Sequence, residues 1–401
     1  MLTLDKIYHA RFILKQVARK TDLIAAPHLC PDTDLYLKTE NLQVTGSFKV
    51  RGAYYKISQL TAEERAKGVI ACSAGNHAQG VALAATRMGI RSVVCMPDGA
   101  PLMKVESTKR LGAEVELVRG TYDDAHDRAV ELQQQTGMTF IHPYDDELVI
   151  AGQGTIGLEI LDQLPDVDAV IVPVGGGGLI AGVAFAIKSL RPEVKVYGVQ
   201  AAGAPSMAQA YHTGRYQTLE AVDTFADGIA VKTPGELTFA MAESYVDDIV
   251  TVSEDEIAAA ILALMENQKL VAEGAGATPV AAALFGKLPL ADKKTACLIS
   301  GGNIDVNILS RVITRGLVMS GRKVNLMIAL EDKPGQLTRV SEIISGCGAN
   351  VVSVQYDLAD TNMAITSCFL KLGLETRNGA QVEEIKQRLA EAGFSLVNER
   401  V

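Results

Sequence analysis

Lys49 is the first residue whose type and surroundings could carry chemistry. It follows Gly46, Ser47 and Phe48 in the segment KTENLQVTGSFKVRGA, residues 38–53, and precedes an apolar stretch that could form a helix. A lysine in such a place is most often simply solvated. Its alternative use is as an amine that condenses with the aldehyde of a bound cofactor to form a Schiff base.

A run of four glycines is the most specific local signal. The segment VGGGGLIAG, residues 174–182, follows the apolar run AVIVPV and precedes a helical pattern. Successive glycines let the backbone wrap around a phosphate with its N–H groups pointing inward at a helix N-terminus. The segment therefore predicts a phosphate site that needs no basic side chain.

The same glycines also fit the dinucleotide fingerprint G-x-G-x-x-A, through Gly176, Gly178 and Ala181. A nicotinamide enzyme would need Asp or Glu about 20 residues later, at the end of the next strand, to bind the ribose. After the next apolar run, KVYGV, stands Gln200. The phosphate of a smaller cofactor is thus the favoured ligand.

Two further loops supply polar groups. SAGNHAQG, residues 73–80, lies between the apolar run GVIAC and a helical pattern, and its small residues would expose N–H groups to a carboxylate. In CLISGGNID, residues 297–305, Ser300 ends an apolar run before two glycines. Each loop alone could be an ordinary turn. Together, the four segments provide an amine, a phosphate site and polar groups, as a phosphorylated aldehyde cofactor requires.

The elements that must position these residues indicate an α/β fold. Continuous rather than alternating apolar runs are typical of strands buried on both faces of a parallel sheet. The strand candidates are residues 68–72, 92–97, 169–174, 195–199 and 296–300. The helix candidates are residues 77–88, 122–136, 179–189 and 254–268, the last beginning with the capping-box spacing Ser253 to Glu256.

The pattern changes near residue 320. After the polar segment MSGRK, residues 319–323, the sequence predicts a strand, the turn DKPG, a helix, two strands, a helix and a last strand. These elements are placed at residues 324–330, 332–335, 337–346, 351–358, 363–372, 381–392 and 394–398. The order βαββαβ is that of the ferredoxin-like split motif, so a separate domain is expected here.

Composition narrows the class of partner. With 401 residues, 48% of them hydrophobic, the chain is long enough for two or three domains. The net charge is −9 and the sequence has no run of basic residues, so it does not favour binding to nucleic acid or to an anionic membrane surface. Six scattered cysteines without a CxxC pair, no signal-peptide pattern and no long apolar span predict a cytoplasmic protein that binds a small molecule.

The segments ENLQVTGSFKVRGA, SAGNHAQG, VGGGGL and SGGN stand in the order and approximate spacing of the threonine and serine dehydratases. The chain resembles these members of the tryptophan-synthase-β-like pyridoxal-phosphate enzymes over residues 5–320. The resemblance implies two open parallel-sheet αβα domains with pyridoxal 5'-phosphate in the cleft between them. It implies a catalytic region at residues 1–320, with a small subdomain at about 50–150 and a large one at about 1–49 plus 151–320. Beyond it, VNLMIALEDKPGQL resembles the opening of an ACT-type amino-acid-sensing domain, residues 321–401.

The resemblance also assigns roles. Lys49 would be the Schiff-base lysine, Phe48 its packing neighbour at the ring, Asn76 a hydrogen-bond partner of the ring hydroxyl, and Ser300 the group facing the pyridine nitrogen. The phosphate would be held by Gly175, Gly176, Gly177, Gly178 and Leu179. The substrate carboxylate would be held by Ser73, Ala74, Gly75, Asn76 and His77.

The implied reaction is threonine ammonia-lyase chemistry, L-threonine to 2-oxobutanoate and ammonia, with L-serine as a second substrate. Lys49 would remove the α-proton as a general base. Ser300 is neutral and cannot keep the ring nitrogen protonated as a carboxylate would, which favours rapid β-elimination over racemisation or transamination.

Other activities stay open as alternatives. Serine or hydroxyaspartate dehydration would use the same groups. Serine racemases of this group have a serine where this chain has Ala74. They also have a divalent-metal site with acidic residues. The segment APSM at 204–207 lacks such acids, so no metal is expected. Sulfhydrylases differ after the lysine, where this chain has VRGA. A non-catalytic amino-acid sensor is the alternative from another class.

For the ACT-like segment, we expect an amino-acid effector site where the turn feeds a helix N-terminus. The residues named for it are Asp332, Pro334, Gly335 and Gln336. Isoleucine or valine is the candidate effector if the enzyme is biosynthetic. A purely structural dimerisation module is the alternative. By analogy the chain forms a homodimer or homotetramer.

Overall fold

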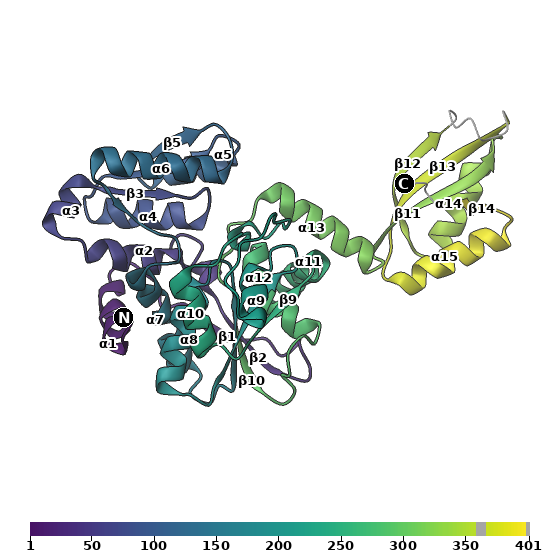
Figure 1. Cartoon of the computed structure of the whole chain (residues 1–401). Coiled ribbons are helices and arrows are strands. Elements are labelled where there is room, and N and C mark those ends of the chain that lie inside the picture. The colour runs from purple at the N-terminus through teal and green to yellow at the C-terminus, as the bar shows by residue number, and fades with distance from the viewer. Residues whose placement is uncertain (358–365, 398–401) are drawn as a thin grey trace. The chain divides into compact units, whose positions relative to one another are not determined.

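The computed structural model describes residues 1–357 and 366–397. The chain divides into two compact units, Met1–Asp305 and Val306–Val401. The first holds two sheets and the second holds one (Figure 1). No helix in the described ranges is long and apolar enough to cross a membrane.

The smaller sheet of the first unit is wholly parallel, in the order β5-β4-β3-β6. Its strands are β3 (Val69–Cys72), β4 (Ser92–Pro97), β5 (Glu114–Val118) and β6 (Thr139–Phe140). The associated helices are α2 (Lys49–Ser58), α3 (Ala62–Lys67), α4 (Asn76–Arg87), α5 (Leu102–Arg110) and α6 (Tyr122–Thr136). Every residue of β3 is buried, as expected for a strand covered on both faces.

The larger sheet has the order β1-β2-β10-β7-β8-β9 and is parallel except for β1, which pairs antiparallel with β2 at one edge. Its strands are β1 (Leu23–Ala25), β2 (Asp34–Lys38), β7 (Ala169–Pro173), β8 (Lys195–Ala201), β9 (Asp248–Val252) and β10 (Lys294–Leu298). Its helices are α1 (Leu4–Leu14), α7 (Glu147–Gln163), α8 (Gly178–Leu190), α9 (Ser206–Thr213), α10 (Glu236–Tyr245), α11 (Glu254–Ala263) and α12 (Gly274–Leu284). Short 3-10 turns cover Glu40–Leu42 and Asp227–Ile229.

The two parallel sheets confirm the predicted α/β class, with three differences in detail. The helix predicted at 254–268 begins with the expected capping box but ends at Ala263, and Leu264–Gln268 form a π-helical turn closed by Lys269 at φ 58°. The strand predicted at 296–300 runs from Lys294 to Leu298, so Ser300 lies in the loop beyond it. The strands β1, β2, β5, β6 and β9 were not predicted.

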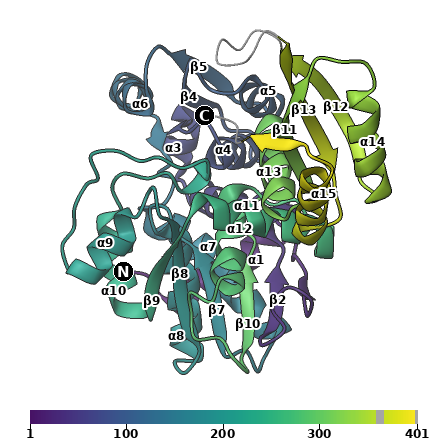
Figure 2. The same cartoon turned by 90° about the vertical axis from the view of Figure 1, so that its right-hand side faces the viewer.

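The second unit begins with α13 (Val306–Met319) and continues as βαββαβ, as predicted. Its elements are β11 (Lys323–Glu331), α14 (Gln336–Gly346), β12 (Asn350–Asp357), β13 (Ser367–Glu375), α15 (Gly379–Glu391) and β14 (Ser395–Val397). The sheet is antiparallel in the order β12-β13-β11-β14, and α14 and α15 share one apolar core with it (Figure 2). The predicted strand positions 358, 363–365 and 398 lie outside the described residues.

Candidate active site

Lys49 is the first residue of α2, and its surroundings come from both sheets. Its Nζ donates to the carbonyl oxygen of Pro143 at 2.7 Å and lies 5.3 Å from the centre of the Phe48 ring. The Phe48 N–H donates to the carbonyl oxygen of Ser300 at 3.0 Å, which joins the start of α2 to the loop after β10. Burial lowers the pKa of Lys49 to about 8, although the nearby Glu273 opposes that shift. An amine with such a pKa is partly neutral near pH 7 and can act as nucleophile or base.

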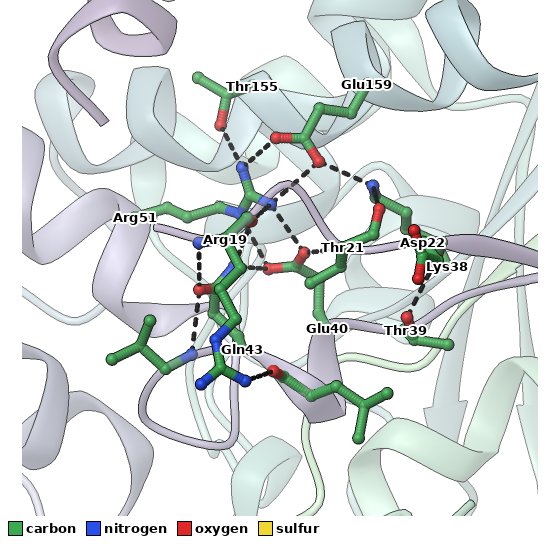
Figure 3. Close-up of polar contacts among 12 residues, drawn as sticks. Arg19, Thr21, Asp22, Lys38, Thr39, Glu40, Gln43, Arg51, Thr155 and Glu159 are labelled. Carbon is green, nitrogen blue, oxygen red and sulfur yellow. Dashed lines mark hydrogen bonds and ion pairs between the residues drawn. The ribbon is translucent and has the colours of Figure 1, made fainter. Parts of the chain in front are cut away.

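A buried ion cluster anchors α2 two residues beyond Lys49 (Figure 3). The Arg51 guanidinium pairs with Glu40 at 2.8 Å and with Glu159 of α7 at 2.7 Å, and Lys38 pairs with the same Glu159 at 2.7 Å. Burial alone would lower the pKa of Arg51, but the two carboxylates raise it. Two cations and two anions balance inside the unit, so the cluster ties α2 to β2 and α7 without a net buried charge.

The glycine loop follows β7 and opens α8. Gly177, the residue before the helix, has φ 96°, a conformation that favours glycine. None of the N–H groups of residues 175–179 donates to another described residue. A Cβ atom on Gly176 would lie 2.5 Å from the Tyr144 ring, and one on Gly178 would lie 2.7 Å from the Tyr144 carbonyl oxygen. The loop thus offers free donors at a helix N-terminus.

The asparagine loop follows β3 and opens α4. Asn76 is the first residue of that helix, and its Nδ2 donates to Oε1 of Glu273 at 2.7 Å. The Ser73 hydroxyl accepts from the Gly75 N–H at 3.2 Å, while the N–H groups of Ala74, Asn76 and His77 donate to no described residue. These free donors fit a carboxylate.

His77 is neutral in this environment. Its Nε2 donates to the carbonyl oxygen of Ile141 at 2.8 Å, and its Nδ1 is buried without a partner among the described residues. Burial, followed by the charge of Lys49, lowers the pKa of His77 to about 3. His77 is therefore a structural imidazole or a neutral polar contact rather than a cationic carboxylate partner.

Ser300 is 2% exposed, and no described residue hydrogen-bonds its hydroxyl. Its neighbour Gly301 forms an isolated bridge with Ser47, directly before Phe48 and Lys49. The hydroxyl therefore has no partner among the described residues and is available to a ligand.

These contacts bring four of the predicted segments together. Tyr144, which packs on the glycine loop, adjoins Pro143, which accepts from Lys49, and Ser300 is bonded to Phe48. The free N–H groups of the glycine loop fit a phosphate, the half-buried Lys49 amine fits an aldehyde, and the unpartnered Ser300 hydroxyl fits a ring nitrogen. The residues present therefore fit pyridoxal phosphate.

Sequence reasoning missed three residues of this site: Tyr144, Glu273 and Asn303. Asn303 Nδ2 donates to Asn76 Oδ1 at 2.7 Å, across 227 residues of sequence. A single acid within the small-residue run VAEGAGAT was the available signal for Glu273, since an acid among buried small residues is unusual.

The proposed effector residues belong to the second unit. Gly335, at φ 89°, caps α14, and Gln336 is its first residue. The Asp332 N–H donates to the carbonyl oxygen of Thr366 at 2.8 Å, which fixes the turn against the start of β13. Asp332, Pro334 and Gly335 are exposed.

The fold and the site define a pyridoxal-phosphate enzyme, and the chain belongs to that family: residues 14–302 match the family model described as pyridoxal-phosphate dependent enzyme. An L-threonine ammonia-lyase of Thermotoga maritima is 52% identical over 398 residues, covering 99% of both chains. The processed form of threonine deaminase isoform 2 from Solanum lycopersicum is 40% identical with a TM-score of 0.73, covering 78% of this chain and 88% of that one. Maize serine racemase is 33% identical with a TM-score of 0.74, covering 79% and 98%.

Proposed function

We propose that this chain is a threonine ammonia-lyase, which converts L-threonine to 2-oxobutanoate and ammonia with loss of water. The observation that carries the proposal is the half-buried Lys49 amine, joined through Pro143 and Tyr144 to the free N–H groups of the glycine loop. The relative of the same activity that matches along nearly the whole chain supports the choice of substrate.

In this proposal each segment would hold one part of the cofactor. Lys49 would bind the aldehyde, the N–H groups of Gly175 to Leu179 would bind the phosphate, Asn76 would bind the ring oxygen, and Phe48 would pack beside the ring. When bound, pyridoxal phosphate supplies an electron sink for the charge that develops at the substrate α-carbon.

The chain's own residues bind the substrate and move its proton. The free N–H groups of the loop from Ser73 to His77 bind the substrate carboxylate. Lys49 Nζ removes the α-proton, a step suited to an amine whose pKa burial lowers to about 8. Ser300 and Glu273, which are 2% and 4% exposed, are shielded from bulk water.

Ser300 favours elimination in this proposal. Its hydroxyl is neutral and cannot hold the ring nitrogen in its protonated form as a carboxylate would. Racemisation would also need a second acid on the opposite face of the α-carbon, and Ala74 offers none at the position where racemases have serine. L-serine is a second substrate, because one methyl group changes binding by only about 1 to 3 kcal/mol.

Product analysis tests the proposal. Purified protein with pyridoxal phosphate and L-threonine should release 2-oxobutanoate and ammonia in equal amounts, and the Lys49→Ala variant should release neither. Lys67→Ala is a suitable control, because Lys67 is an exposed lysine of α3 that forms an ion pair with the exposed Glu63. D-amino acid without keto acid would identify a racemase. Cofactor binding without either product would support the sensor alternative.

We also propose that the second unit senses an amino acid, with isoleucine or valine bound at residues 332–336, in an enzyme of isoleucine biosynthesis. Support comes from the βαββαβ order and from the left-handed Gly335 at the start of α14. A cytoplasmic homodimer or homotetramer is part of the same proposal, and light scattering on the purified protein would measure its mass.

A further inference from the structure

Glu273 places a buried carboxylate beside Asn76. The residue is 4% exposed, and its Oε1 accepts from Asn76 Nδ2 at 2.7 Å. A Cβ atom on Gly301 would lie 2.4 Å from the same oxygen, so the glycine after Ser300 leaves the space that the carboxylate occupies. The Glu273 N–H in turn donates to the Gly301 carbonyl oxygen at 3.0 Å. The carboxylate is therefore built into the turn that carries Ser300.

A chain of hydrogen bonds fixes which end of the Asn76 amide faces Glu273. Asn303 Nδ2 donates to the carbonyl oxygen of Thr45 at 2.8 Å, and a carbonyl oxygen can only accept. The same Nδ2 donates to Asn76 Oδ1 at 2.7 Å, which turns the Asn76 nitrogen toward Glu273. One hydrogen of that nitrogen is used by Glu273, and the second has no acceptor among the described residues.

We propose that Glu273 is a positioning residue of the cofactor site, whose carboxylate holds the Asn76 amide so that its second N–H is available to the cofactor's ring oxygen. This inference rests on the proposed function, because it assumes that pyridoxal phosphate binds beside Lys49. A carboxylate accepts more strongly than a neutral group, and it polarises the amide that donates to it. The charge of Glu273 thereby changes the strength of the hydrogen bond that Asn76 donates to the cofactor's ring oxygen.

That charge changes with pH near neutrality. Burial, assisted by the negative charge of Asp227, raises the pKa of Glu273 to about 7, while the Asn76 hydrogen bond and Lys104 oppose the shift. Lys49 also interacts electrostatically with Glu273, and Lys104 forms an ion pair with Asp227. The carboxylate thus loses its charge as the pH falls through about 7.

The test is a pH titration of the visible absorbance of the bound cofactor in the holoenzyme. We expect a spectral transition centred near the pKa of Glu273 in the unchanged protein. Glu273→Gln keeps the shape and an acceptor oxygen but removes the charge, so the transition should disappear while the cofactor stays bound. Asp227→Asn removes a negative neighbour from an exposed position and should move the transition to lower pH.

Glu256→Gln is the matched control. Glu256 belongs to the same unit, but it lies in the first turn of α11 and forms an ion pair with Lys287. It should leave the transition unchanged. An identical transition in the unchanged protein and in Glu273→Gln would overturn the inference, as would the lack of any transition near neutral pH in the unchanged holoenzyme. If Glu273→Gln does not fold, an unmoved transition in Asp227→Asn overturns it. Failure of the unchanged protein to bind the cofactor would instead contradict the proposed function.

Discussion

At Lys49 the surrounding protein changes the chemistry of an ordinary side chain. The local sequence favoured a solvated lysine, since nothing in the segment GSFKVRG shows what lies around the amine. In the structure, the Pro143 carbonyl, the Phe48 ring and the buried Glu273 surround it. Burial disfavours the cationic form, and the amine becomes available as a nucleophile and base.

The first prediction concerns the pH dependence of cofactor capture. Only the neutral amine condenses with an aldehyde, and the neutral fraction of Lys49 rises as the pH passes through its pKa of about 8. The rate at which cofactor-free protein binds pyridoxal phosphate should therefore rise with pH and level off above about 8, as stopped-flow absorbance would measure. A rate that continues to rise toward about 10, the range of an ordinary lysine, would contradict the lowered pKa.

The second prediction concerns the glycine loop. Gly176→Ala places a methyl group 2.5 Å from the Tyr144 ring, so either the ring or the loop must move. The phosphate should lose at least one N–H donor, which weakens cofactor binding by about tenfold or more. Gly99→Ala is the control, because its Cβ meets nothing within 4 Å. Equilibrium titration with pyridoxal phosphate measures both, and equal affinities would refute the predicted role of the loop.

The strand order explains why distant segments meet. β2, β10 and β7 are neighbours in the larger sheet and run parallel, so the loops that follow them leave from the same edge. Those loops lead to Lys49, carry Ser300 and form the glycine loop, respectively. The order of the strands along the chain does not show that β2, β10 and β7 are neighbours in the sheet.

The sequence predicted the central strands closely and the edges poorly. β3 and β7 are buried at every position, so their continuous apolar runs matched the structure within one residue. β1 has three residues and β6 has two, too few for any hydrophobic period to appear. Glu273 and Asn303 were missed because their partner Asn76 lies about half the chain away, and only tertiary structure joins them.

The third prediction concerns the ion cluster that anchors α2. Arg51→Met leaves Glu40 and Glu159 buried with fewer cationic partners, which should lower the free energy of unfolding of the first unit by about 3–5 kcal/mol. Arg91→Met is the matched control, because the pair that Arg91 forms with Glu114 is exposed and should contribute little. Urea unfolding of both variants measures the difference. Similar losses in the two variants would contradict a special role for the cluster.

At the scale of the whole molecule, the two units have separate apolar cores, and the family match ends at residue 302, close to the division after Asp305. The sequence predicted the division at 320/321, where the polar segment MSGRK follows α13. The boundary at 320/321 remains a prediction. In the structure α13 contacts β11, and the division into compact units groups α13 with the second unit.

The fourth prediction follows from this division. A chain that ends at Asp305 should still convert threonine to 2-oxobutanoate, because every proposed catalytic and cofactor-binding residue lies before that point. It should no longer respond to isoleucine or valine, whereas the full chain should. Initial rates measured with and without each amino acid test both statements. Inhibition of the shortened chain by isoleucine would place the effector site in the first unit.

The most direct test of the account is to locate the cofactor on the chain. Borohydride reduction of the holoenzyme, followed by proteolysis and mass spectrometry, should find one reduced cofactor attached to the peptide that contains Lys49, and the Lys49→Ala variant should carry none. Attachment to a different lysine, or no attachment in the unchanged protein, would contradict the assignment of Lys49 as the residue that binds pyridoxal phosphate.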